Sequence, residues 1–178
     1  DYVVPAGTDR LLVMAAATSM ESDIWEKATY GSTEMTYVTA HHDGFGTGVA
    51  IWVLSLGSSL TAETAQHITL SHFSGNVLFV DAEFATVAVF ENVDQSDPYA
   101  PTVPEPPGPG ARRFGIQDDA WPNTAPRALT VPSEPGDLIF SIYVAYNDDG
   151  DGHPANNPAA GQTVLRTATA NTDPGPCS

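Results

Sequence analysis

One acidic loop near the C-terminal end, with the sequence NDDGDG, has the pattern of a calcium site. Asn147, Asp149 and Asp151 stand at alternate positions, and Gly152 follows where a calcium loop needs a sharp turn. Pro158 occupies the place of the closing glutamate, so the segment is not an EF-hand. Two interpretations stay open, a surface Ca²⁺ site completed by backbone carbonyls and a solvated turn without metal. Calcium is therefore the one cofactor that the sequence suggests.

The three tryptophans are the residues best suited to bind a sugar, because an aromatic face packs well against a pyranose ring. Trp52 stands in an apolar segment and is expected in the core. Trp25 and Trp121 stand among polar residues, so we predict that both lie in loops and are the candidate binding residues. Together with the acidic loop, they support the hypothesis of a calcium-dependent carbohydrate-binding module.

Evidence for catalysis is weaker. Asp81 and Glu83 lie two residues apart on one predicted strand, so they share a face as a glycosidase pair would, although most such pairs on a very acidic protein are plain surface charge. The chain has no G-x-S-x-G nucleophile motif and no phosphate-binding glycine loop. Its histidines have no metal-ligand spacing, so we predict no transition-metal site. They are His41, His42, His67, His72 and His153.

The charge balance restricts the partners. Twenty-two acidic residues oppose six basic ones, which gives a formal net charge of −16 over 178 residues. Such a surface repels the phosphate backbones of nucleic acids and anionic membranes, so we predict neither as a partner, while cations, basic proteins and neutral glycans remain possible partners. No apolar run approaches the roughly 20 residues that a membrane helix needs, so we predict no membrane insertion. The single cysteine, Cys177, excludes an internal disulfide.

The chain begins at Asp1 without Met. We expect removal of a signal peptide or trimming, and a location that is extracellular, on a cell surface or in a virion.

Strand patterns dominate the chain. The stretch Val77–Pro98 organises it, because Phe84–Phe90 is apolar on both alternating faces and is expected to be a central strand. Arg10–Ala17 and Val49–Leu56 have the same pattern. A hairpin turn is expected at residues 31–34 and a helical turn at residues 59–63. Residues 66–73 alternate between apolar and polar side chains, as a strand with one buried face does. About ten short strands and no long helix predict one all-β domain over residues 1–178, an antiparallel, jelly-roll-like β-sandwich.

Six prolines between positions 98 and 109 forbid a helix or an interior strand there, so a proline-rich excursion is expected over residues 97–126.

Four motifs resemble a β-sandwich domain family of secreted and surface-attached bacterial proteins and of phage structural proteins. They are Val4-Pro-Ala-Gly7 with Arg10-Leu-Leu-Val13, Ala28-Thr-Tyr-Gly-Ser-Thr-Glu-Met-Thr36, Ile51-Trp-Val-Leu54 and Asn92-Val-Asp-Gln-Ser-Asp-Pro98. The resemblance covers about the first hundred residues and carries no catalytic motif. It implies an extracellular structural or adhesive role. Because the family pattern continues into further closing strands, either the last strands are rearranged in this chain or one edge of the sheet is open to a neighbour's strand.

The sequence thus favours a non-enzymatic structural or adhesive subunit that assembles with copies of itself, or with other surface proteins, into a surface filament, adhesin or virion. The alternative is the calcium-dependent carbohydrate-binding module, with glycans as partners. A glycoside hydrolase is a more distant alternative. The tail Asn92–Pro98 is expected to be structural, with Asn92 and Asp94 capping a turn.

Overall fold

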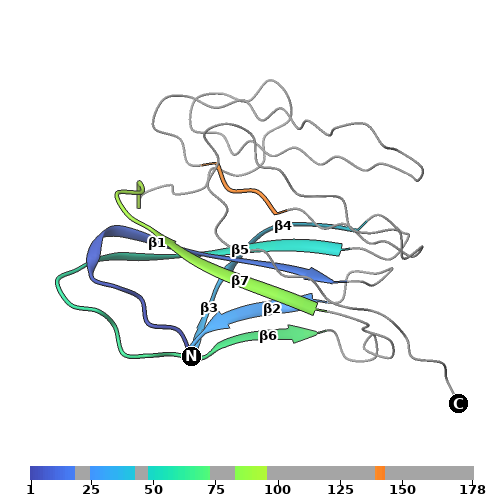
Figure 1. Ribbon diagram of the computed structural model, residues 1–178, viewed down its shortest axis with the longest axis horizontal. Helices are drawn as coiled ribbons and strands as arrows, with labels where there is room; N and C mark the ends of the chain where they lie inside the picture. Colours follow the sequence, from blue (N-terminus) through green and yellow to red (C-terminus); the bar gives the residue numbers. More distant parts are fainter. Residues whose placement is uncertain (19–24, 43–47, 73–82, 96–138, 143–178) are drawn as a thin grey trace, which may run out of the picture.

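The computed structural model describes residues 1–18, 25–42, 48–72, 83–95 and 139–142. These residues form seven antiparallel strands in two sheets, which lie one over the other as layers (Figure 1). One sheet has the order β4-β5-β1-β7 and the other β3-β2-β6. The strands are β1 (Gly7–Thr18), β2 (Trp25–Tyr30), β3 (Thr33–Glu34), β4 (Thr36–His42), β5 (Gly48–Ser59), β6 (Ile68–His72) and β7 (Glu83–Phe90). The predicted all-β, antiparallel, sandwich-like architecture is confirmed for this part of the chain.

Strand β1 lies between β5 and β7 and is buried on both faces, as its sequence predicted. Leu12 and Met14 face the second sheet and join the main core, where they are 0% and 1% exposed. Leu11 and Val13 face the other way and form a smaller cluster, against which Phe140 packs. The outer face of the four-stranded sheet is therefore covered by a segment far along the chain, which explains why β1 has no polar face.

The expectation that Phe84–Phe90 is a central strand is not met among the described strands. Among the described strands, β7 lies at the end of its sheet and pairs with β1 alone, and its side chains are exposed or only partly buried. Its two apolar faces have a different cause. Val87 and Val89 pack toward the main core, whereas Phe90 joins the outer cluster and contacts Phe140 with ring centroids 6.3 Å apart.

The three-stranded sheet contains a hairpin within the predicted turn of residues 31–34, but it is tighter than predicted, because Thr33 and Glu34 form strand β3 and the following strand β4 pairs in the other sheet. Strands β2 and β3 pair in the register Tyr30↔Thr33, so the turn consists of Gly31 and Ser32. Gly31 has a φ of 58°, a conformation that favours glycine. Ile68 and Leu70 of β6 pack against the main core as the alternation predicted.

The helical turn expected at residues 59–63 is wrong, because β5 continues as far as Ser59 and no helix forms after it. The described residues contain strands and turns but no helix, so none of them forms a helix able to cross a membrane.

A buried arginine joins the strand ends at one end of the sandwich. Arg10 is 2% exposed. Its Nε donates to the carbonyl of Gly57 at 2.9 Å, its Nη1 donates to the carbonyl of Pro5 at 2.9 Å, and its Nη2 donates to Glu63 Oε1 at 2.8 Å. The side chain of Gln95 accepts the N–H of Gly57 at 2.9 Å. We call Arg10, Gly57, Glu63 and Gln95 the Arg10 clamp.

The clamp gives structural roles to two of the sequence motifs. The motif Val4–Gly7 provides a carbonyl to Arg10, and the tail after β7 provides Gln95. Asn92 has a φ of 58° and its N–H donates to the carbonyl of Thr8 at 2.8 Å. The predicted turn at Asn92 is therefore present, and it folds the tail back on the start of β1.

Candidate functional site: a groove between the sheets

An open hollow of about 460 Å³ lies where the chain crosses from one sheet to the other. It is lined by residues of β2, by residues of β5 and by the connection from β3 into β4. The lining residues are Glu26, Lys27, Glu34, Met35, Thr36, Tyr37 and Trp52. We call this hollow the Trp52 groove. Its size falls within the range of about 300–1,000 Å³ that is usual for small-molecule sites.

Two irregular strand pairings shape the groove. The register of β2 against β6 shifts between Trp25 and Lys27, and the register of β4 against β5 shifts between Tyr37 and Thr39. Such bulges re-aim side chains and break strict alternation. Consequently Glu26 and Lys27 are both exposed although they are neighbours on a strand. Thr36 and Tyr37 are also both exposed, and they lie at the start of β4, just before its bulge.

Aromatic rings form the base of the groove. Trp52 is 1% exposed and contacts two rings edge-on, Trp25 at 6.0 Å and Tyr37 at 6.1 Å between centroids. Tyr37 is 51% exposed, so its ring is open to solvent above the buried indole. The Nε1 of Trp52 is buried and has no hydrogen-bond partner among the described residues. Buried polar groups usually have a partner, which makes this N–H exceptional.

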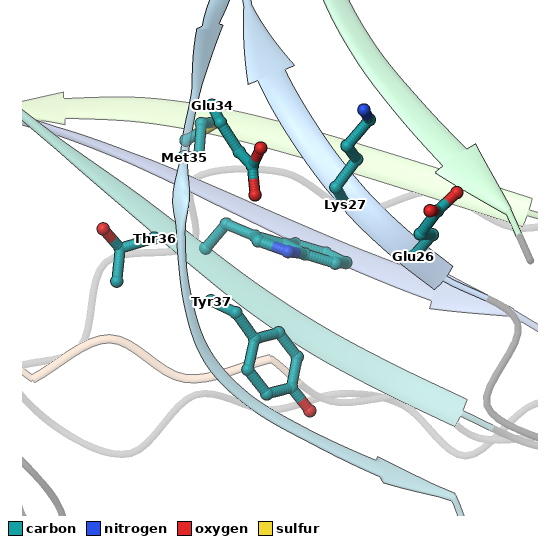
Figure 2. A pocket seen from close by; sticks show the side chains of 7 residues that line it. Glu26, Lys27, Glu34, Met35, Thr36 and Tyr37 are labelled. Atoms are coloured by element: carbon teal, nitrogen blue, oxygen red, sulfur yellow. The ribbon is translucent and has the colours of Figure 1, made fainter.

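Charged groups surround the aromatic base. Figure 2 shows Glu26, Lys27 and Glu34 along one side of the groove and the ring of Tyr37 on the other. Two carboxylates can accept hydrogen bonds, and the ammonium of Lys27 can donate them. Lys27 is the only lysine of the chain. The groove therefore combines an aromatic ring, acceptors and donors on one accessible surface.

The structure corrects the placement of Trp25. It begins strand β2, is 4% exposed and belongs to the main core, so the expectation that it stands in a loop is wrong. Its Nε1 donates to Glu83 Oε1 at 2.6 Å. The polar residues around it in the sequence misled the prediction, because they are exposed while the indole turns inward. With both its ring and its N–H engaged, Trp25 offers no face to a ligand.

Glu83 links the two sheets instead of standing free for catalysis. It accepts from Trp25 of β2, and its carboxylate lies 3.1 Å from the Nε2 of His72 of β6, whereas Glu83 itself belongs to β7. Its predicted catalytic partner, Asp81, lies outside the described residues.

The remaining predicted site residues are distributed as follows. Trp52 is in the core as expected, and it also lines the groove. His67 lies 2.6 Å from Asp1, and His72 lies beside Glu83, so these two histidines have separate partners. The described residues contain no cluster of ligands suited to a metal ion. Trp121, Asn147, Asp149 and Asp151 lie outside the described residues, as do Cys177 and the excursion 97–126.

Tyr37 and the charged residues beside it were not among the binding residues predicted from the sequence. One signal was available, because Lys27 and Tyr37 stand on either side of the hairpin predicted at residues 31–34. A hairpin brings its two arms together, but the bulges that expose these side chains are not visible in the sequence.

Tyr30 is the described residue whose acid–base behaviour differs clearly from normal. It is 5% exposed in the main core. Burial raises the pKa of its phenol above the ordinary value of 10.0, and the negative charge of Glu63 raises that pKa further, against an opposing contribution from Arg10. Tyr30 therefore stays neutral at physiological pH and serves the core.

Comparisons with protein-family models, with curated proteins and with solved structures each give no significant match.

Proposed function

We propose that this chain is a non-enzymatic extracellular module that acts as an adhesive, binding its target through the Trp52 groove. One observation carries the proposal. Tyr37 is half exposed above a buried tryptophan, within a hollow that also presents carboxylates and an amine. Exposed aromatic residues with convergent polar groups are typical of recognition surfaces.

The framework suits this role. The Arg10 clamp fixes the strand ends, and Glu83 connects the two sheets. Glu83 also holds Trp25, whose ring packs edge-on against Trp52 at the base of the groove, so we expect the groove to be formed before its ligand arrives and little ordering of the protein to oppose binding. The carboxylates of Glu63 and Glu83 are engaged in these structural contacts, which is why we favour binding over glycoside hydrolysis.

The proposed location is extracellular, on a cell surface or in a virion. A net charge of −16 and a single cysteine fit that setting, and the charge argues against nucleic acid as a partner. The resemblance to the family of surface-attached and phage β-sandwich domains stays a prediction. The structure gives physical roles to some of its motif residues, because Arg10 and Gln95 meet at Gly57.

The test is binding to intact cells. Fluorescently labelled protein is incubated with yeast, with Gram-positive bacteria and with cultured epithelial cells, and bound protein is measured by flow cytometry. We expect saturable binding to at least one cell type, displaced by unlabelled protein. Binding to none of the three, or binding that unlabelled protein does not displace, would contradict an adhesive role.

A second candidate function, a self-assembling structural subunit, is favoured by the edge of the four-stranded sheet. Among the described strands, β7 pairs only with β1 and ends its sheet, and an edge strand of this kind can pair with a strand from a second copy. Sedimentation velocity over a concentration series and electron microscopy test this candidate. Ordered filaments or particles would support it, whereas a monomer at every concentration would exclude it.

A further inference from the structure

We propose that the Trp52 groove binds a sugar ring of a neutral glycan. This inference names the ligand class for the site on which the proposed adhesive function rests. Three features support it: the exposed ring of Tyr37, the hydrogen-bonding groups around that ring and the charge of the protein.

The exposed ring of Tyr37 provides the apolar contact. Among the described residues, four large hydrophobic side chains are exposed, and Tyr37 is the aromatic one; the others are Val3, Leu60 and Ile139. A phenol ring presents a flat apolar face with a polar hydroxyl at its tip, which matches the C–H face and the hydroxyl rim of a pyranose. The edge-on contact with Trp52 holds this ring in place.

The polar groups of the groove need a ligand that both donates and accepts. Glu26 and Glu34 accept hydrogen bonds, whereas Lys27 donates them. Trp52 lies beneath these groups with its N–H buried, so the polar contacts of the groove are those of the two carboxylates and the ammonium. A hydroxyl group donates one hydrogen bond and accepts others, so a polyhydroxylated ring complements both kinds of group. A simple cation would complement the carboxylates alone, and a simple anion would complement the donors alone.

The overall charge distinguishes neutral glycans from acidic ones. With a net charge of −16, the protein repels polyanions at long range. Two carboxylates against one ammonium leave the groove itself with an excess of negative charge. Uronic acid polymers and sulfated polymers are therefore poor ligands, and an uncharged glycan is the class that remains.

Affinity electrophoresis tests the proposal directly. Native gels contain hydroxyethylcellulose, arabinoxylan or galactomannan as neutral probes, and polygalacturonate as the acidic probe. We expect the protein to be retarded in at least one neutral gel and not in the acidic gel. No retardation by any neutral probe, or retardation by polygalacturonate alone, overturns the proposal.

Two variants locate the site. Tyr37→Ala removes the exposed ring, and we expect at least a tenfold weaker retardation. Glu34→Gln removes one acceptor charge at the groove, and we expect a weakening of several-fold. The matched control is Glu91→Gln, an exposed carboxylate that does not line the groove, and it should leave retardation unchanged. If Tyr37→Ala binds like the wild type, the groove is not the sugar site.

The same variants separate this inference from the proposed function. Circular dichroism and a melting curve first establish that Tyr37→Ala is folded, as expected for a half-exposed position. If folded Tyr37→Ala binds intact cells as the wild type does but is no longer retarded by a neutral polysaccharide, the sugar site stands and adhesion through the groove is refuted. If folded Tyr37→Ala is retarded like the wild type, the sugar site in the groove is refuted. If the wild type binds no cells but is retarded by a neutral polysaccharide and Tyr37→Ala is not, the sugar site stands and cell adhesion is refuted.

Discussion

At the scale of single residues, the charged and polar side chains that are buried in this protein mainly hold strands together. Arg10 is the clearest case, because its guanidinium donates to three backbone carbonyls, those of Pro5, Leu56 and Gly57, and to the carboxylate of Glu63. Arginine suits this position because its planar group presents several donors in a fixed geometry. A lysine offers only one nitrogen and cannot reach all four acceptors at once.

Replacing Arg10 by methionine is expected to lower the free energy of unfolding by about 3 kcal/mol, because it leaves the carbonyls and Glu63 without their donor. Urea denaturation measures the loss. Lys27→Met is the matched control, since it removes an exposed cation outside the clamp and should change stability by no more than about 0.5 kcal/mol. Equal effects of the two variants would show that the clamp contributes nothing.

The raised pKa of Tyr30 predicts that the fold loses stability in alkaline solution. Its pKa in the folded state is raised, chiefly by burial, so the unfolded chain ionises first as the pH increases. The folded state then binds more protons than the unfolded state, and the free energy of unfolding falls as the pH rises above about 10. Below that pH the phenol is neutral in both states and its contribution is constant.

Tyr30→Phe removes the titrating group and should flatten this alkaline decrease. Near neutral pH we expect a small effect, because the phenol is neutral in both states and its hydrogen bond to the carbonyl of Tyr2 is long, at 3.5 Å. Urea denaturation of both proteins at neutral pH and at a series of alkaline values provides the comparison. Parallel pH profiles for the variant and the wild type would rule out Tyr30 as a source of the decrease.

At the scale of elements, strand β1 determines the architecture. Its inward residues contact the second sheet, and its outward residues contact the cluster that includes Phe140. The four-stranded sheet is therefore covered on both faces. Phe140 belongs to this cover, although it lies far from the seven strands in the sequence.

Removing the ring of Phe140 tests this cover. Phe140→Ala should lower the free energy of unfolding by about 2 kcal/mol, less than for a fully buried phenylalanine because this ring is only partly buried. Ile139 is the adjacent control. It is 52% exposed, so Ile139→Ala should cost no more than about 0.5 kcal/mol. Similar losses for the two variants in urea denaturation would mean that Phe140 does not cover the sheet.

At the scale of the whole molecule, the excess of negative charge affects the stability of the fold. Sixteen uncompensated charges repel one another in the compact state. Salt screens this repulsion, so an effect of any added cation on stability must be separated from general screening.

The predicted calcium loop is tested on this basis. If Asn147, Asp149 and Asp151 bind Ca²⁺, calcium at about a hundred times its dissociation constant should stabilise the fold by roughly 2–3 kcal/mol. Melting curves in CaCl₂ and in MgCl₂ at equal ionic strength separate binding from screening. The double substitution of Asp149→Asn and Asp151→Asn should abolish the difference. An equal shift with both salts would favour the solvated turn.

The sequence by itself determined the class of fold and several local features. Apolar runs on both faces predicted β1 and β5, the glycine at position 31 marked the hairpin, and alternation placed Ile68 and Leu70 inward. These features follow from the side-chain period of a strand and from backbone sterics, which act over a few residues. The order of strands did not follow, since β7 has the composition of a central strand yet lies at the end of its sheet among the described strands.

Only the tertiary structure revealed the groove. Trp25 and Trp52 are chemically alike, and the sequence could not show that both turn inward while Tyr37 stays exposed. That difference arises from two bulges and from packing between residues distant in sequence. The Arg10 clamp also depends on residues distant in sequence, because Arg10 donates a hydrogen bond to Glu63 and the N–H of Gly57 donates one to Gln95. Local patterns determine which segments become strands, whereas long-range pairing decides which side chains come together and which remain available to a ligand.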